Sequence, residues 1–145
     1  MHRGGINVDF IGIHTFEELC QDWVTVQADL GNLPFLPERV GAFWSPDVQV
    51  DVAAASWRTK NILLGECKWL TGKVGRGVIR QLVDKSERML PRGDWTVHYV
   101  FFARQGFTQA ARQEAQSLNA AMVTLELLER DLYQWMKSRP SNARS

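Results

Sequence analysis

The spacing of apolar residues changes its period along the chain. From residue 15 to about 30, apolar residues recur mostly three or four positions apart, which predicts a helix with one buried face. Residues 47–56, DVQVDVAAAS, alternate between polar and apolar instead, which predicts a strand. One face of this strand is expected to carry Val48, Val50 and Val52, and the other Asp47, Gln49 and Asp51.

The same patterns continue to the end of the chain. They predict strands at 40–44, 47–56, 61–70, 95–103 and 120–125, and helices at 15–30, 73–90, 108–118 and 125–138. WRTKN, residues 57–61, has the length and polarity of a hairpin turn. Thr15 and Glu18 match a capping box, Thr108 is a second candidate cap, and Pro91 and Gly93 are expected to end a helix.

This order of elements, α-β-β-β-α-β-α-β-α, predicts an α/β fold. An antiparallel hairpin is expected to lead into a mixed sheet of four to five strands with helices on its faces. Crossover helices between the later strands favour parallel pairing there. The length of 145 residues suits one domain, expected over 1–137 and followed by a flexible tail at 138–145.

Composition narrows the function classes. No apolar run approaches the ~20 residues of a membrane span, and the amino terminus lacks a secretory pattern, so a cytoplasmic protein without membrane contact is expected. Cys20 and Cys67 lack the spacing of a zinc site and are expected to be buried thiols. Residues 68–92 include seven basic residues and only two acidic ones. The candidates for contact with nucleic-acid phosphates are Lys73, Arg76 and Arg80.

The stretch GECKW, residues 65–69, places two charges inside the apolar run NILLGECKWL. Glu66 and Lys68 project from the same face of a strand, so the simplest interpretation is an ion pair. The alternative is a functional site, because charges in a central strand are costly unless they are paired or bind a metal. Asp51, on the other arm of the hairpin, completes the pattern D-x14-E-x-K.

Two carboxylates from neighbouring strands are the hard oxygen ligands that Mg²⁺ prefers. A lysine beside such an ion can orient the attacking water and offset charge that develops on a phosphate. The Cys67 side chain is expected on the opposite face, which leaves its carbonyl oxygen as a third ligand.

This arrangement resembles the PD-(D/E)xK nuclease superfamily. HTFEELCQDWV, FWSPDVQVDVAA, LLGECKW and VGRGVIRQLVDK, in that order, also resemble the carboxy-terminal nuclease-like domain of unknown function of archaeal-type ATPases, over about residues 8–125. The resemblance implies a restriction-endonuclease-like core in which Asp51 and Glu66 bind metal and Lys68 is catalytic. It implies Glu17 as an additional acid, with Glu18 as the neighbouring alternative, and Gln81 as a polar residue facing the site.

The sequence departs from the superfamily pattern at two positions. The proline–aspartate pair occurs as Pro46-Asp47, which makes Asp47 a rival of Asp51. Gln49 stands where relatives often carry glutamate, so a second acid for a second metal is absent from that strand.

The sequence thus predicts a Mg²⁺-dependent nuclease, with Mn²⁺ as an alternative ion, that hydrolyses phosphodiester bonds of nucleic acid. DNA is the expected substrate. The alternative is a non-catalytic nucleic-acid-binding or regulatory module that serves a partner ATPase. TGKVG, residues 71–75, lacks the pattern of a phosphate-binding loop, so an ATPase partner, in cis or in trans, is expected to be a separate module.

Overall fold

The elements of the computed structural model, which describes residues 8–90 and 94–138, follow the predicted order. They are α1 (Val8–Asp29), β1 (Arg39–Trp44), β2 (Gln49–Ser56), β3 (Asn61–Lys68), α2 (Arg76–Met89), β4 (Thr96–Ala103), α3 (Gln109–Ser117), β5 (Ala121–Thr124) and α4 (Leu125–Ser138). Thr108 caps α3 as expected, because its side chain accepts a hydrogen bond from the Ala111 N–H.

The strands form one mixed sheet in the order β1-β2-β3-β4-β5. The first three strands are antiparallel, and β4 and β5 join them in parallel, as the crossover helices predict. The carboxyl ends of β3, β4 and β5 therefore lie at the same edge of the sheet.

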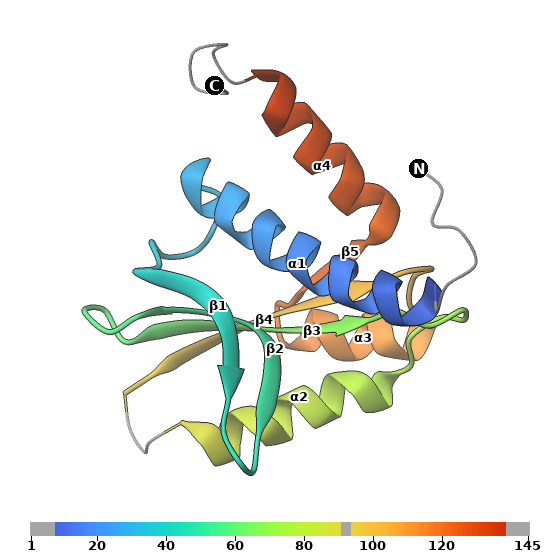
Figure 1. The fold of residues 1–145 in the computed structure, drawn as a ribbon. Coiled ribbons are helices and arrows are strands. Elements are labelled where there is room, and N and C mark those ends of the chain that lie inside the picture. The colour runs from blue at the N-terminus through green and yellow to red at the C-terminus, as the bar shows by residue number, and fades with distance from the viewer. Residues whose placement is uncertain (1–7, 91–93, 139–145) are drawn as a thin grey trace.

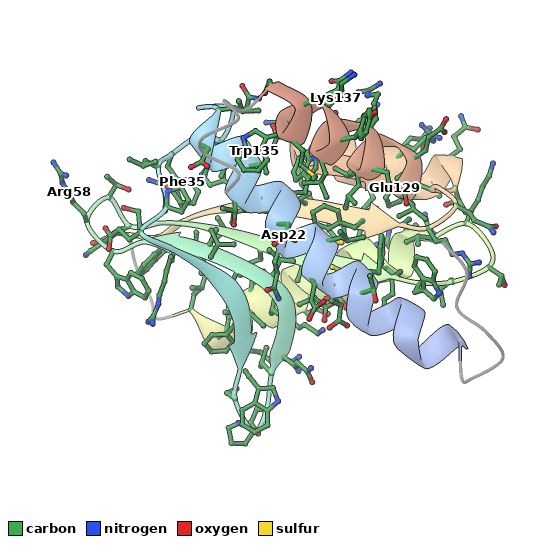
Figure 2. The ribbon with its side chains drawn as sticks, turned by 45° about the horizontal axis from the view of Figure 1, so that its top comes forward. Asp22, Phe35, Arg58, Glu129, Trp135 and Lys137 are labelled. Atoms are coloured by element: carbon green, nitrogen blue, oxygen red, sulfur yellow. The ribbon has the colours of Figure 1, made fainter. Side chains whose placement is uncertain are left out.

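Helices cover both faces of this sheet (Figure 1). α1 and α4 pack over one face, where Cys20, Val24, Val52 and Phe102 belong to one buried cluster. α2 and α3 pack over the other face against a second cluster that includes Val50, Leu64, Ile79 and Phe101. Figure 2 shows Asp22 on α1, where the helix crosses the sheet, and Arg58 projecting outward from the β2–β3 turn.

The alternation predicted for β2 is wrong at its centre. Gly41 of β1 pairs with Ala53, but Phe43 pairs with Val50, so β2 carries one extra residue, a β-bulge. As a result Val50 belongs to the cluster under α2, whereas Val52 belongs to the cluster under α1. A bulge reverses which face each side chain meets, and the sequence alternates straight through it.

α1 begins at Val8, not near residue 15. Thr15 and Glu18 therefore lie inside the helix, and the predicted capping box is wrong. Gly12 and the β-branched Ile11 and Ile13 lower the intrinsic helix propensity of the preceding segment, which made it look irregular. Continuation from a stable helix overrides such local preferences.

α2 begins at Arg76, later than expected, with Gly75 at its N-cap. Val74 instead forms a parallel bridge with Phe107, and it is almost fully buried. Gly75, a residue of low helix propensity, disfavours an earlier helix start. Pro91 and Gly93, the predicted helix stop, lie outside the described residues, as does most of the predicted tail.

None of the helices in the ranges 8–90 and 94–138 combines the length and hydropathy required to cross a bilayer.

Candidate functional site at the divergence of two strands

A polar cleft of about 370 Å³ opens where β2 separates from β3. Elements from both helical layers contribute to it as well as the two strands. Its walls are formed by Glu17, Gln49, Asp51, Glu66, Cys67, Lys68, Trp69, Leu70 and Lys85. The structure thus brings together Asp51, Glu66, Cys67, Lys68 and Glu17, all of which the sequence singled out.

The cleft exists because the β2–β3 ladder ends early. Pairing runs from Ser56–Asn61 to Val52–Gly65 and stops before Asp51 would meet Glu66. Beyond this point the Asp51 side chain replaces the backbone pairing, because its Oδ2 accepts a hydrogen bond of 2.9 Å from the Cys67 N–H. Gln21 of α1 donates to the Asp51 carbonyl at 3.0 Å and holds the bulged strand against the helix.

Glu66 lies between two lysines. Its Oε2 is 3.7 Å from Lys68 Nζ, and its Oε1 is 3.4 Å from Lys85 Nζ. The Glu66 side chain is only 11% exposed. The ion pair that sequence suggested between Glu66 and Lys68 therefore exists, but at a long distance and within a cleft that also holds Asp51.

Burial raises the pKa of Asp51 above its ordinary value, although the Cys67 N–H and the ammonium groups of Lys85 and Lys68 oppose this shift. Burial likewise raises the pKa of Glu66, and the negative charge of Asp51 raises it further, against the opposing effect of the two lysines. Two neighbouring carboxylates whose ionisation is disfavoured by burial form a site that an added cation stabilises.

Cys67 contributes its backbone to the cleft. Its thiol packs with Cys20 in the cluster under α1, and both cysteines are buried and free, as predicted. A hydrogen bond with Cys20, together with burial, raises the pKa of the Cys67 thiol, so the thiolate is strongly disfavoured. Because the N–H and C=O of one strand residue point to the same edge, the Cys67 carbonyl faces the side on which Asp51 lies.

The donor atoms of the cleft suit a hard cation. In the part of the chain that the structure describes, no group of three or more histidine, cysteine, aspartate or glutamate side chains converges as in a closed metal cage. Asp51 and Glu66 supply two carboxylates, and Cys67 supplies a carbonyl. Mg²⁺ usually keeps several waters and takes one or two protein carboxylates, so this set fits Mg²⁺ better than Zn²⁺.

The structure separates the alternatives that sequence left open. Glu17 lines the cleft, whereas Glu18 is exposed. Asp51 lines the cleft, whereas Asp47 borders a different depression, beside Arg88. Gln81 is exposed and does not belong to the wall of the cleft.

The three basic residues predicted to contact nucleic acid, Lys73, Arg76 and Arg80, are exposed and lie outside the cleft wall. Lys73 is in the loop before α2, and Arg76 begins that helix. Arg80 Nη2 lies 3.4 Å from Glu114 Oε1 on α3, so its charge is partly offset.

Two features of the cleft were missed as site residues. Lys85 of α2 donates to the Gln49 carbonyl at 2.9 Å and reaches Glu66; it shares a helix face with Gln81, four residues earlier. Trp69 lies between Phe16, with ring centroids 5.1 Å apart, and Arg104, whose Cζ is 4.4 Å from the ring centroid. Trp69 follows the motif directly, but only the fold brings Arg104 to it.

A larger cavity, of about 450 Å³, lies elsewhere, under the β1–β2 hairpin. Its wall is mostly apolar, with Phe43, Ile62, Met89 and Trp95 among its side chains and Arg39 as its charged residue. Without carboxylates or paired charges, it lacks the chemistry of the smaller cleft.

A family model matches residues 7–80, about half of the chain; its family, DUF234, is described as archaeal and bacterial proteins of unknown function. This chain belongs to DUF234. The matched segment contains Glu17, Asp51, Glu66 and Lys68, and it ends before Lys85. None of the curated proteins matches this DUF234 chain.

One solved structure identifies the fold of this DUF234 chain, and a second is more distantly similar. The MspJI restriction endonuclease, solved in complex with a 27-mer oligonucleotide, has a TM-score of 0.53 at 20% identity; the match covers 81% of this chain and 27% of the MspJI chain. AF1548, a protein of unknown function, has a TM-score of 0.45 at 17% identity over 76% of this chain and 64% of its own. The DUF234 chain thus has a restriction-endonuclease-like α/β fold, as predicted, and spans about a quarter of the MspJI chain.

Proposed function

We propose that this chain is a Mg²⁺-dependent nuclease that hydrolyses phosphodiester bonds of DNA. One observation carries the proposal: Asp51, Glu66 and Lys68 converge in a single open cleft at the point where β2 and β3 diverge. The fold, which resembles that of a restriction endonuclease solved in complex with an oligonucleotide, supports it.

Each of the three residues has a role that follows from its position. Asp51 and Glu66 would hold the ion, with the Cys67 carbonyl as a further oxygen donor. When bound there, Mg²⁺ would supply Lewis-acid activation of a water and of the scissile phosphate. Lys68, 32% exposed, presents its ammonium at the open side of Glu66, where it can hold the water or offset charge on the phosphate.

Basic and aromatic groups around the cleft suit a polyanionic substrate. Trp69 lines the cleft and stacks against Arg104, and Lys73 and Arg76 are exposed in the segment that follows the motif. Such residues contact phosphates and bases without reading sequence.

A second function is favoured by the contacts that the charged groups of the cleft already make with one another. Asp51 already accepts the Cys67 N–H, and Glu66 already faces two ammonium groups. A network of this kind is also expected in a module that binds nucleic acid without cutting it and serves a partner ATPase, in cis or in trans.

Cleavage assays separate the two functions. Supercoiled plasmid, branched DNA and structured RNA are incubated with the wild type and with D51N and K68M, with Mg²⁺, with Mn²⁺ and with a chelator. K60A, at the exposed other end of β3, is the matched control. Metal-dependent cleavage of DNA by the wild type and K60A, lost in D51N and K68M, is the expected result. Binding of DNA without cleavage would support the regulatory module, and cleavage of RNA alone would replace the substrate.

A further inference from the structure

Lys85 differs from the other basic residues of α2. Arg76, Arg80 and Arg88 are exposed, whereas the Lys85 side chain is 25% exposed and reaches into the cleft. It arrives from the helical layer opposite to α1, which contributes Glu17. The cleft therefore contains a second ammonium group that the D-x14-E-x-K pattern does not include.

The contacts of Lys85 are those of a bound cation. Its Nζ donates a hydrogen bond of 2.9 Å to the Gln49 carbonyl and lies 3.4 Å from Glu66 Oε1. A backbone carbonyl and a carboxylate oxygen are also ligands that a divalent ion takes. The ammonium thus contacts two hard oxygen atoms of the cleft. The other carboxylate oxygen, Glu66 Oε2, faces Lys68.

The charges of the cleft side chains explain why an ammonium group, and not a second metal ion, lies beside Gln49. Gln49, on β2, is neutral, so the strands contribute the carboxylates of Asp51 and Glu66, and α1 contributes that of Glu17. The two strand carboxylates are neutralised by one divalent ion, and a second ion near Gln49 would meet a carbonyl, one shared carboxylate and an ammonium group. Like charges at such distances repel strongly in a partly buried cleft.

We infer that Lys85 is a built-in cation that occupies the place of a second metal ion in the cleft. The inference rests on the proposed function, since it concerns the same cleft, and assigns Lys85 as a positioning residue. Lys85 holds Glu66 and the bulged strand in register at the Gln49 carbonyl.

Metal titration of the full chain tests this inference without reference to activity. Isothermal calorimetry with Mn²⁺ should give one ion per chain for the wild type. K85E, which replaces the ammonium by a carboxylate beside Glu66, should bind two ions per chain. K85M, which removes the charge without adding a ligand, should still bind one, because no acid is gained.

R76E is the matched control. Arg76 lies nine residues before Lys85, two and a half helical turns, so it projects from the opposite side of α2. R76E makes the same charge change outside the cleft and should bind one ion, as the wild type does. Circular dichroism before each titration confirms that the variants are folded.

The outcomes separate the two proposals. Two ions in the wild type, or a single ion of unchanged affinity in K85E, would overturn the role of Lys85 and leave the nuclease proposal standing. One ion in the wild type and two in K85E, without cleavage of any nucleic acid, would support the inference and remove the nuclease. No ion in any variant would overturn both.

Discussion

The two ends of strand β3 carry ion pairs that look alike in sequence and differ in their surroundings. At the turn end, Lys60 Nζ lies 3.2 Å from Asp94 Oδ2, with side chains 52% and 75% exposed. At the cleft end, Glu66 is 11% exposed and lies 3.7 Å from Lys68 and 3.4 Å from Lys85. The shorter contact is the exposed one.

This difference indicates what each pair is for. An exposed pair contributes roughly 0–1 kcal/mol, and water can replace either partner. A buried carboxylate loses its hydration, and long contacts to two lysines repay that loss poorly. The Lys60–Asp94 pair is therefore a surface contact, whereas the raised pKa of Glu66 is a perturbation of the kind that is common at functional sites.

The largest expected effect comes from removing the carboxylate at the cleft end. E66Q should reduce Mg²⁺-dependent cleavage about 10²-fold or more and weaken Mn²⁺ binding, because the cleft loses a charged ligand and its transition-state electrostatics. D94N should change neither quantity, because Asp94 lies in the exposed pair. Rates from plasmid nicking and affinities from calorimetry measure both. Equal losses in the two variants would contradict the distinction between the ends.

A large effect on stability is expected at Gly65, beside the cleft. A Cβ added there would lie 3.0 Å from Val100 Cγ1 and 3.0 Å from Val52 Cβ, closer than van der Waals contact allows. G65A should therefore lower the free energy of unfolding by about 1–3 kcal/mol through overpacking. G41A, where a Cβ meets nothing within 4 Å, is the control. Urea denaturation measures both, and equal stabilities would show that the strands move apart without cost.

Much of the fold and of the site follows from local pattern. Alternation and helical spacing predict the order of elements, and parallel pairing follows from the crossover helices. Asp51, Glu66 and Lys68 could be grouped because a hairpin turn of known length sets two strands side by side. Short-range geometry was sufficient for these inferences.

The features that escaped prediction depend on tertiary structure. The β2 bulge leaves no mark in DVQVDVAAAS, since an extra residue is visible only against the partner strand. Lys85 is one of several basic residues on α2, and only the packing of that helix shows which one reaches Glu66. Arg104 lies 35 residues after Trp69 in sequence and meets it because β3 and β4 pair in parallel.

The pH dependence of stability should reveal the raised pKa of Asp51. Because burial raises the folded-state pKa of Asp51, the unfolded chain ionises this group first as pH rises. The wild type therefore loses stability as pH rises from the ordinary value of 3.8 to the raised one. D51N has no such loss, so its advantage in Tm over the wild type should be small near pH 4 and full at neutral pH, in buffer with a chelator. An advantage that shrinks with rising pH would contradict the assigned direction.

The smallest effect is expected at the turn end of β3. K60A removes the exposed partner of Asp94 and should change the free energy of unfolding by about 0.5 kcal/mol or less, because water replaces the lost contact. Lys60 also adopts a φ of 56°, a conformation that alanine accepts no more easily than lysine, so K60G is the informative companion. K60G should match or exceed the stability of K60A, because glycine adopts positive φ without steric cost. Thermal unfolding of both variants at low and high salt measures the two contributions, since salt weakens only the ion pair. A loss well above 1 kcal/mol in K60G would show that the exposed pair stabilises the turn, and the contrast between the two ends of β3 would then rest on burial alone.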